Sequence, residues 1–239
     1  MSGGLKSVTQ PSGVDVKRMF NEIAPRYDLL NHLLSFGSDV YWRRRAVKEL
    51  RLRPGSSLLD IAVGTGDLAF AALNAGSASV VGIDPAEEML KCCRRKSMNL
   101  GVAGALHLIC GVVEALPLKN ESFDGAMVAF GVRNFADVQK GLGEIHRVLR
   151  GGAPFVALEL TEPGFPLVRS VFSLYFHYVV PVLGRLISGS KYAYTYLPHS
   201  VSEFPANEAF AELLKAAGFR NVLFRPLTFG TCTLYYSTK

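Results

Sequence analysis

Two glycines separated by a single residue, Gly64 and Gly66, stand between an apolar run that contains Asp60 and a run with helical spacing. At a strand-to-helix turn, a backbone without Cβ lets a ligand approach closely. Asp84 closes the next strand-like run 18 positions after Gly66, near the spacing of about 20 at which an acid reaches the hydroxyls of a ribose. These residues predict a site for a nucleoside cofactor, although a turn that needs its glycines only for packing would show the same glycine spacing.

The charge around this turn distinguishes two kinds of nucleoside. Gly64, Gly66 and Ala69 also satisfy the dinucleotide fingerprint, so the glycines alone fit a nicotinamide-dependent oxidoreductase equally well. A nicotinamide cofactor places a pyrophosphate against the helix N-terminus. Here Asp60 precedes the turn and Asp67 follows it, and two carboxylates would repel a pyrophosphate. They suit S-adenosylmethionine, which carries a sulfonium, an ammonium and no phosphate, although Asp67 alone could be an ordinary acid in the first turn of a helix.

The segments around the turn alternate between helical and strand-like patterns. Residues 14–36 have helical spacing broken at Pro25, and a third helix is expected over Asp39–Leu50. Strands are expected within residues 56–64, 79–84, 105–111, 123–131 and 154–160, with helices over 67–76, 85–101 and 138–150. This alternation predicts an α/β, Rossmann-like fold: a mostly parallel, doubly wound sheet with helices on both faces.

The tail departs from this alternation. Residues 166–196 are apolar and rich in aromatic side chains, namely Phe172, Tyr175, Phe176, Tyr178, Tyr192, Tyr194 and Tyr196. A last helix over 207–219 and a last strand over 227–237 follow. We interpret residues from about 164 to 204 as a lid-like helical insertion whose aromatic side chains line a pocket for a flat ring and an apolar tail. A buried helix that closes the core is the alternative.

Composition bounds the domain organisation and the setting. With 239 residues and 49% apolar content, the chain suffices for one full-sized domain. We expect residues 1–13 to be a flexible N-terminus and residues 14–239 to be a single domain. The four cysteines include no CxxC pair, which favours a reducing, cytoplasmic setting and no metal site. The longest segment free of formal charge, Ser170–Gly184, is shorter than the roughly 20 residues of a membrane span, so we expect no bilayer crossing.

A set of separated segments carries a further signal. FNEIAPRYDLLNHLLSFGSDVYW, with Tyr27, Asp28, Asn31, Ser35 and Trp42, is followed by VEALPLKNESFD, FGVRNFAD, RVLRGG, LELTEP, KYAYTYLPHSVSEFP and LTFGTCTLYYSTK. In composition and order these segments resemble the UbiE/MenG family of ubiquinone and menaquinone biosynthesis C-methyltransferases, which are class I S-adenosylmethionine-dependent enzymes. The likeness covers roughly residues 14–239. It implies C-methylation of a polyprenylated quinol ring, that of demethylmenaquinol or of 2-polyprenyl-6-methoxy-1,4-benzoquinol.

The chain departs from the family pattern at several positions. Asp39 stands where the signature usually has His, Gly151–Ala153 replaces Pro-Gly-Gly, and Tyr235 stands where His is common. Val112 occupies the place of an Asn or Asp that bonds the adenine, and Ala129 that of a Ser. The resemblance therefore implies an adenine held by backbone N–H groups and apolar contact.

The resemblance also implies roles for individual residues in binding S-adenosylmethionine. Gly64, Thr65 and Gly66 would pass beneath its methionine and ribose parts, and Asp84 would accept hydrogen bonds from both ribose hydroxyls. Met89 would cover the adenine, although a methionine at helical spacing is more often part of the core. The full set of expected cofactor residues is Asp60, Gly64, Thr65, Gly66, Asp84, Pro85, Met89, Val112, Val113 and Ala129.

Catalysis of methyl transfer requires alignment of donor and acceptor, stabilisation of a phenolate-like quinol oxygen and a dry wall around the ring. Arg133 and Asn134 follow a strand end on the face where doubly wound sheets bind ligands, although Arg133 could equally be a surface ion-pair partner. The resemblance adds Tyr27 and Asp28 from the N-terminal helices as candidates. His177 is a base within the aromatic stretch, but a lone His on an apolar face is more often satisfied within the core.

The expected partners are a lipid-tailed quinol and an anionic membrane surface, contacted through Arg43, Arg44 and Arg45 beside Trp42. No nucleic acid is expected, because the basic cluster is short and no RNA-reading signature occurs. Alternatives stay open: a methyltransferase for RNA or another small molecule, the nicotinamide-dependent oxidoreductase, and a non-catalytic scaffold. The sequence also leaves open a homodimer, the kind of quinol ring, the length of its tail and the general base.

Overall fold

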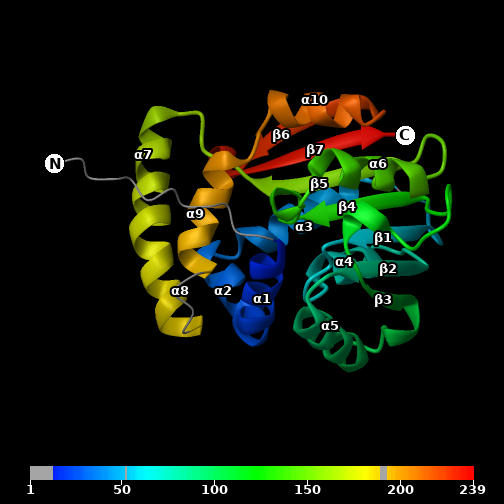
Figure 1. Ribbon diagram of the computed structural model, residues 1–239, viewed down its shortest axis with the longest axis horizontal. Helices are drawn as coiled ribbons and strands as arrows, with labels where there is room; N and C mark the ends of the chain where they lie inside the picture. Colours follow the sequence, from blue (N-terminus) through cyan, green and yellow to red (C-terminus); the bar gives the residue numbers. More distant parts are fainter. Residues whose placement is uncertain (1–12, 52, 189–192) are drawn as a thin grey trace.

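The computed structural model of the chain describes residues 13–51, 53–188 and 193–239, so the expected flexible N-terminus lies outside the described residues apart from Gly13. One sheet runs through the molecule in the order β3-β2-β1-β4-β5-β7-β6 (Figure 1). Its strands are β1 (Ser57–Ile61), β2 (Ser79–Asp84), β3 (Leu106–Cys110), β4 (Gly125–Ala129), β5 (Pro154–Leu160), β6 (Arg220–Leu227) and β7 (Cys232–Thr238). The strand order reverses between β1 and β4, and open α/β sheets bind ligands at such a switch point.

The pairing confirms the mostly parallel, doubly wound sheet. β1 pairs in parallel with β2 and with β4, β2 with β3, and β4 with β5. Only β7 runs antiparallel to its neighbours, β5 and β6, within the described chain. Leu58, Leu59 and Ile61 of β1 are buried, as expected for a strand that is covered on both faces.

Helices cover both faces of the sheet. α6 (Val138–Val148) and α10 (Glu208–Ala216) pack on one face, where Leu142 and Phe210 enter the core. The other face carries α3 (Ser38–Glu49), α4 (Asp67–Asn74) and α5 (Glu87–Asn99), whose buried side chains include Trp42, Phe70 and Cys93. These layers hold the strand ends of the switch point in fixed positions.

The N-terminal helices form a third core beside the sheet. α1 (Gly13–Ile23), the 3-10 turn η1 (Ala24–Arg26) and α2 (Tyr27–Leu34) bend at Pro25, as expected. Ile23 and Leu30 pack in one cluster with Met89 of α5 and with Phe176 of the aromatic stretch. The N-terminal helices thereby contact both α5 and the insertion.

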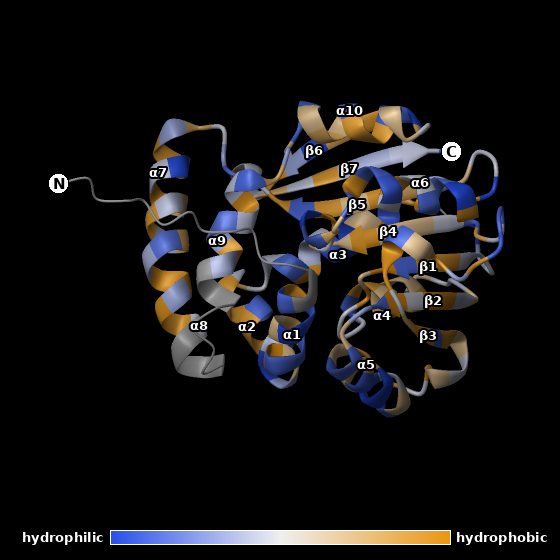
Figure 2. Ribbon diagram, viewed as in Figure 1, coloured by the Kyte–Doolittle hydropathy of each residue, from blue (hydrophilic) through white to orange (hydrophobic). Residues whose placement is uncertain are grey.

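The aromatic stretch is helical, as expected. α7 (Pro166–Leu174), a π-helical turn η5 (Tyr175–Val179) and α8 (Val180–Ser188) form one long rod at the edge of the molecule, and α9 (Ala193–Glu203) lies between this rod and the sheet (Figures 1 and 2). By length and composition the 19 residues of Pro166–Gly184 could span a membrane, and 17% of that apolar window is buried. The run passes this test because Arg169 is its single cation near the N-terminal end. The test concerns length and composition alone, so the expectation of no bilayer crossing stays a prediction.

Two details near the C-terminus also differ from expectation. Arg220–Leu227 forms the edge strand β6, which the sequence patterns did not predict because its residues, Pro226 included, are mostly exposed and lack a continuous apolar face. The last strand begins at Cys232, since the 3-10 turn η6 (Thr228–Gly230) occupies the start of the expected segment.

Candidate active site

The glycine turn lies at the switch point, directly after β1. Its backbone has positive φ angles at Ala62 (52°), Gly64 (55°) and Gly66 (95°). An added Cβ on Gly66 would lie 2.5 Å from the Cys93 Sγ and 2.8 Å from the ring of Phe70, so packing requires this glycine. An added Cβ on Gly64 would meet only the Ala62 carbonyl oxygen, at 3.9 Å. The packing explanation therefore holds for Gly66, whereas the side of Gly64 is open to a ligand.

The turn after β4 packs against the glycine turn. Phe130, like Ala62, has a positive φ (60°) although it is not a glycine. An added Cβ on Gly131 would lie 2.6 Å from the Ala62 Cβ. Strained backbone at the ends of adjacent strands is typical of functional sites whose surroundings hold it in place. The two turns are in contact, and each limits the shape of the other.

Asp84 at the end of β2 is held by the glycine turn. The Gly64 N–H donates to Asp84 Oδ2 at 2.9 Å, and the Ala86 N–H donates to Oδ1 at 2.8 Å. Burial raises the pKa of Asp84 to about 6, and the two backbone N–H groups oppose that rise. At neutral pH the carboxylate is charged, and its remaining lone pairs can accept hydrogen bonds from two hydroxyl groups.

Asp60 is a buried acid beside the same turn. Its Oδ2 has no hydrogen-bond partner among the described residues. Burial raises the pKa of Asp60 well above its ordinary value; the charge of Arg43 opposes this rise and that of Asp84 adds to it. A buried carboxyl oxygen without a partner fits a ligand that brings its own donor, such as an ammonium group.

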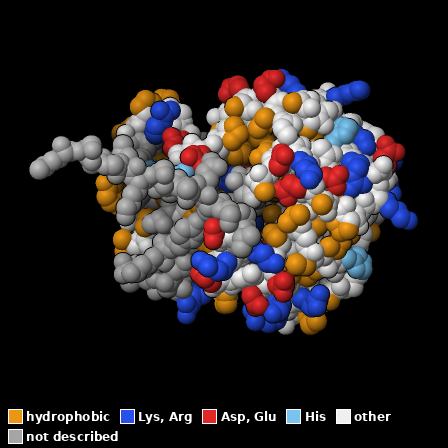
Figure 3. All heavy atoms as spheres, in the orientation of Figure 1, with side chains coloured by type: hydrophobic (Ala, Val, Ile, Leu, Met, Phe, Trp, Pro, Cys, Tyr) orange, Lys and Arg blue, Asp and Glu red, His pale blue; other side chains and the backbone are white. Residues whose placement is uncertain are grey.

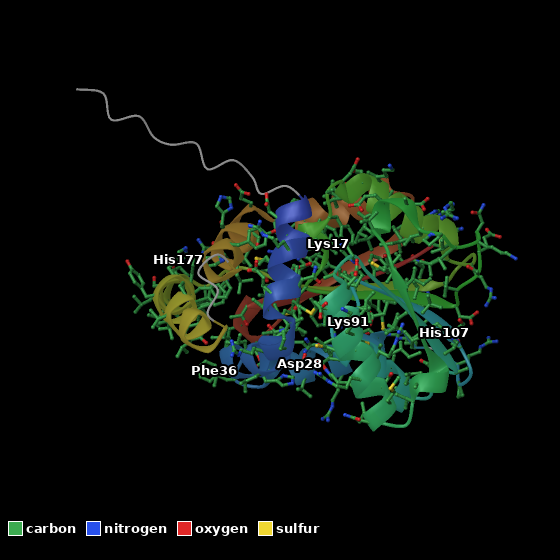
Figure 4. The ribbon with its side chains drawn as sticks, turned by 60° about the horizontal axis from the view of Figure 1, so that its bottom comes forward. Lys17, Asp28, Phe36, Lys91, His107 and His177 are labelled. Carbon is green, nitrogen blue, oxygen red and sulfur yellow. The ribbon has the colours of Figure 1, made fainter. Side chains whose placement is uncertain are left out.

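Ion pairs connect α2 to the glycine turn. Lys96 Nζ of α5 lies 2.5 Å from Asp67 Oδ1 and 2.7 Å from Asp28 Oδ2, and the Thr65 hydroxyl donates to Asp28. Figure 4 shows Asp28 where α2 approaches α5. Asp28 thus faces the glycine turn, and Asp67 is a paired acid in the first turn of α4.

A second group of charges lies on the inner face of α3. Arg43 is buried, pairs with Asp39 and lies 3.9 Å from Asp67, while His32 Nδ1 lies 2.7 Å from Asp39. The expectation that Arg43 rests on lipid headgroups is therefore wrong, because its i, i+4 partner Asp39 shares the buried face of the helix. His32, Asp39 and Asp67 offer ligand atoms within 4.8 Å of one another. Arg43 lies against both carboxylates and supplies a positive charge there, and the expectation of no metal stays a prediction.

A cavity of about 30 Å³ borders the glycine turn and is lined in part by Tyr27, Asp60, Gly64, Thr65 and Ala129. This volume is far below the roughly 300 Å³ or more of a small-molecule site, so we expect admission of a nucleoside to involve movement of the surrounding side chains or helices. Acids nevertheless outnumber cations here: Asp28, Asp39, Asp60, Asp67 and Asp84 against Arg43 and Lys96. This balance and the orphaned Asp60 oxygen fit a cationic ligand without phosphate.

Four of the other expected cofactor residues do not line the small cavity. Met89 is buried in the third core, and Val113 is buried beneath α6. Val112 is 47% exposed, and Pro85 is half-buried after β2. Ala129 lines the cavity, whereas the contacts of the other four with an adenine stay a prediction.

A larger cavity of about 500 Å³ adjoins the site. Its walls include Phe172, Tyr175 and Phe176 of the insertion and the edge-to-face pair Trp42 and Phe130, whose ring centroids are 5.9 Å apart. Its volume lies within the range of small-molecule sites, and aromatic walls suit a flat ring. Phe172, Tyr175, Phe176 and Tyr196 of the insertion thus line a cavity, as expected, whereas Tyr178 is exposed on the rod and Tyr192 lies outside the described residues.

Tyr27 separates the two cavities, since among the described residues it alone lines both. Burial raises the pKa of its hydroxyl; a hydrogen bond with Asn31 and the charges of Arg133 and Arg43 oppose that shift. The hydroxyl is therefore protonated at neutral pH. It can donate a hydrogen bond into the site, and it cannot act there as a base.

Arg133 lines the large cavity and is held by a buried acid. Its Nη1 lies 2.6 Å from Glu159 Oε2, and Glu159 also accepts from the Val132 N–H at 2.7 Å. The Nε of Arg133 is buried and has no partner among the described residues. Burial raises the pKa of Glu159, and the charge of Arg133 opposes that rise. Arg133 is thus an oriented cation with one unsatisfied donor, and it is not a surface ion-pair partner.

The last two candidates lie outside the wall of the large cavity. The Asn134 Oδ1 accepts from the Tyr196 hydroxyl at 2.8 Å, and Tyr196 rather than Asn134 lines the cavity. His177 is exposed on the rod, with its Nδ1 2.9 Å from the Ser173 carbonyl oxygen (Figure 4). The expectation of a core position for His177 is wrong, and the cavity leaves no role for it as a base.

Sequence reasoning missed Glu159 and Lys96. Glu159 interrupts an apolar strand near its end, which is the signal that singled out Asp60, and it could have been found in the same way. Lys96 gave no local signal, because its acidic partners lie 29 and 68 positions away along the chain.

Comparisons with known proteins agree with this geometry. Residues 7–239 match the ubiE/COQ5 methyltransferase family. The demethylmenaquinone methyltransferase of Thermus thermophilus is 47% identical over 92% of this chain and 100% of its own. The ubiquinone/menaquinone biosynthesis C-methyltransferase UbiE of Geotalea daltonii is 42% identical over 95% of this chain and 97% of its own.

Solved structures share the fold at low identity. The [4+2]-cyclase SpnF superposes with a TM-score of 0.68 at 18% identity, covering 92% of this chain and 78% of its own. A SAM-dependent methyltransferase from Aquifex aeolicus gives 0.59 at 19% identity, covering 96% and 99%. The sequence match extends over nearly the whole length, and the switch-point site lies within it. This chain is therefore a member of the ubiE/COQ5 methyltransferase family.

Proposed function

We propose that this chain transfers a methyl group from S-adenosylmethionine to a ring carbon of a polyprenylated quinol in menaquinone or ubiquinone biosynthesis. One observation carries the proposal: an aromatic cavity of about 500 Å³ meets the glycine turn at Tyr27, with the buried cation Arg133 in its wall. The names of the relatives give the class of acceptor, and the cavity has the size and walls that such a ring needs.

The glycine turn supplies groups that suit the cofactor. We assign Asp84 to the ribose hydroxyls, the face above Gly64 to the methionine part, and the unpartnered Asp60 oxygen to a positively charged group. Thr65, Gly66 and Ala129 complete the floor, and Pro85, Met89, Val112 and Val113 are proposed for the adenine side. When bound, S-adenosylmethionine supplies an activated methyl group that the ring carbon takes up as its C–S bond breaks and a ring proton leaves.

Arg133 and Tyr27 are proposed to act on the acceptor oxygen. An ionised hydroxyl makes the neighbouring ring carbon nucleophilic, and a positive charge in a dry cavity stabilises that ionised form. Glu159 holds the guanidinium of Arg133 in place, and the Nε–H of Arg133 is left without a hydrogen-bond partner among the described residues. The protonated Tyr27 hydroxyl offers a second donor between the cavities. The surrounding aromatic side chains exclude water, which strengthens both interactions.

Asn134 and Asp28 are proposed in supporting positions. Asn134 fixes the hydroxyl of Tyr196 at the cavity wall, and Asp28 ties α2 to Thr65 and Lys96. Opening of α2 would expose the glycine turn to the cofactor, and closure would then shield the reaction. We therefore treat α1 and α2, together with the insertion, as the segments that cover the site.

A cytoplasmic enzyme that collects a lipid-tailed acceptor needs contact with a membrane surface, and we propose peripheral contact of this kind. The basic cluster of α3 does not provide it, since Arg43 is buried and Arg45 lies 3.1 Å from Glu49, which leaves Arg44 exposed. A homodimer is compatible with the exposed edge strand β6 and stays a proposal.

The decisive experiment measures transfer of labelled methyl from S-adenosylmethionine to two acceptors in parallel. These are demethylmenaquinol and 2-polyprenyl-6-methoxy-1,4-benzoquinol, each assayed with the wild type and with Asp84→Ala. We expect label in at least one ring with the wild type and its loss in the variant. Failure of both quinols, while cofactor binding is intact, would refute the assigned acceptor; stabilisation by NADH instead of S-adenosylmethionine would favour the oxidoreductase.

A further inference from the structure

The rod formed by α7, η5 and α8 has an apolar face that the described part of the chain leaves uncovered. Leu167, Val171, Leu174, Tyr178 and Val182 recur at spacings of three and four residues, so they lie on one side of the helix. Leu167 is 75% exposed, Leu174 62% and Tyr178 69%. Figure 3 shows hydrophobic side chains along this edge of the molecule. In a helix that belongs to the core of a globular domain, large apolar side chains of this kind are buried.

The opposite face of the rod belongs to the protein interior. Phe176 and Val180 are buried in the third core, and Phe172 stacks on Phe176 with ring centroids 4.7 Å apart. A third strip, Ser170, Ser173 and His177, is polar and exposed. A helix with one protein-facing side and one polar strip cannot be surrounded by lipid. It can lie in the plane of an interface with its apolar face inserted.

The exposed apolar face is continuous with the mouth of the large cavity. Val171 lines the cavity and is 63% exposed, and Phe36 lines it and is 81% exposed. Phe36 contacts Tyr175 of the rod with ring centroids 5.7 Å apart, and Figure 4 shows it at the end of α2 beside the rod. Leu29 and Leu33 continue this rim on the exposed side of α2. The entrance of the cavity therefore opens within an apolar surface and not into a polar groove.

We infer that this surface, the rod face with Phe36, Leu29 and Leu33, docks on the interface of a lipid bilayer and admits the acceptor from the membrane directly into the cavity. The inference rests on the proposed function for the identity of the acceptor, while the docking itself depends only on the surface. A bilayer is favoured over a second copy of the chain because the cavity mouth lies inside the patch. A protein partner would close that mouth, whereas acyl chains extend it. The net charge of +6 adds attraction to anionic headgroups.

The test compares two triple variants of equal net charge. The docking variant carries Leu167→Gln, Leu174→Gln and Val182→Gln, none of which lines the cavity. The control variant carries Met98→Gln, Leu100→Gln and Leu223→Gln, which are comparably exposed on α5, after α5 and on β6. Circular dichroism and S-adenosylmethionine binding establish that both variants fold like the wild type.

Each protein is sedimented with vesicles of phosphatidylcholine, with and without phosphatidylglycerol. We expect the wild type and the control to bind, and the docking variant to bind at least about a hundredfold more weakly to both vesicles. Equal binding of the two variants, or no binding by the wild type, would overturn the inference. A third outcome would also overturn it: the wild type is a dimer, the docking variant is a monomer, and both bind vesicles equally. The face would then be a dimer interface.

A second readout separates docking from the proposed reaction. With a short-tailed, water-soluble quinol the docking variant should turn over like the wild type, and with a long-tailed quinol in vesicles it should lose at least about tenfold in rate. If the wild type methylates neither quinol, the proposed function fails while the vesicle result still decides the docking. If both acceptors are methylated equally by the docking variant, the docking route fails and the proposed function stands.

Discussion

Affinity for S-adenosylmethionine should fall as the pH drops below 6, because Asp84 must be charged to accept hydrogen bonds from the ribose hydroxyls. Burial raises its pKa to about 6. If the ligand binds only the charged form, the apparent Kd is multiplied by a factor of about 1.1 at pH 7 and about 11 at pH 5. We therefore expect an affinity loss of about tenfold between these two pH values, which corresponds to about 1.4 kcal/mol.

The same carboxyl should affect stability with the opposite sign. Its pKa rises from an ordinary 3.8 to about 6 in the folded protein. Between these values the folded protein binds more protons than the unfolded chain, so the free energy of unfolding falls as the pH rises. The loss amounts to at most about 3 kcal/mol and is complete above pH 6. The ligand-free protein is thus least stabilised by this group in the pH range where it binds its cofactor best.

Isothermal titration calorimetry from pH 5 to pH 7.5 on the wild type and on Asp84→Asn measures the effect. The asparagine variant keeps the size of the side chain and cannot titrate, so its affinity should be weaker and its pH dependence flatter. Ionisation of the ligand is common to both proteins and cancels in the comparison. The charge of Asp84 raises the pKa of Asp60, so the pH dependence that the asparagine variant keeps includes the altered contribution of Asp60. Equal slopes in the two proteins, or a wild-type affinity that is constant over the range, would refute the assigned role of Asp84.

Three further changes test the rest of the site. Glu159→Gln leaves the buried Arg133 guanidinium without its anion, so the free energy of unfolding should fall by about 3–5 kcal/mol. The variant should also lower kcat at least about a hundredfold with little effect on the cofactor Kd. A variant with the kcat of the wild type would contradict this role. Gly66→Ala should cost about 2–4 kcal/mol in urea unfolding against about 1 kcal/mol for Gly64→Ala, and equal losses would contradict the packing argument. Asp28→Asn removes the charge that pairs with Lys96 and should speed both association and dissociation of S-adenosylmethionine in stopped-flow measurements; unchanged rates would show that α2 does not control access.

The alternation of patterns was sufficient to predict the sheet because each buried strand combined an apolar run with a glycine or acid at its end. β2 and β5 have the expected bounds, residues 79–84 and 154–160. β6 was not predicted because an edge strand forms backbone hydrogen bonds with a neighbouring strand on one side only and does not need an apolar face. Its residues, Arg220 and Arg225 among them, are mostly exposed, so hydropathy carried no information about it.

The site could be predicted where its chemistry is local in sequence. The types and spacing of Gly64, Asp84 and Asp60 indicated one site, and the structure brings these three residues together at the switch point; the binding of a nucleoside there stays a prediction. Arg43 was misplaced because a run of three arginines was treated as one surface, whereas helical periodicity directs each of them to a different side. The Asp39 to Arg43 spacing of four residues could have revealed the buried pair.

Contacts between segments that lie far apart in the sequence could not be predicted from the sequence patterns. Tyr27 stands between two cavities only because α2 folds across the glycine turn, and the ion pairs of Lys96 that accompany this arrangement have no short-range signature. The insertion was expected to surround an acceptor, but the sequence did not distinguish its inner face from its outer one. That distinction needs the fold, since both faces are apolar.

Only one methyl group fits between the turns that follow β1 and β4. That group is the Cβ of Ala62, and Gly131 has no side chain to collide with it. Substitutions at these two positions are therefore interdependent: Gly131→Ala alone creates a collision, and Ala62→Gly beside it removes that collision. We therefore expect natural variation in the loop that follows β1 and in the loop that presents Arg133 to be coupled. Any change of acceptor preference that reshapes one loop will be constrained by the other.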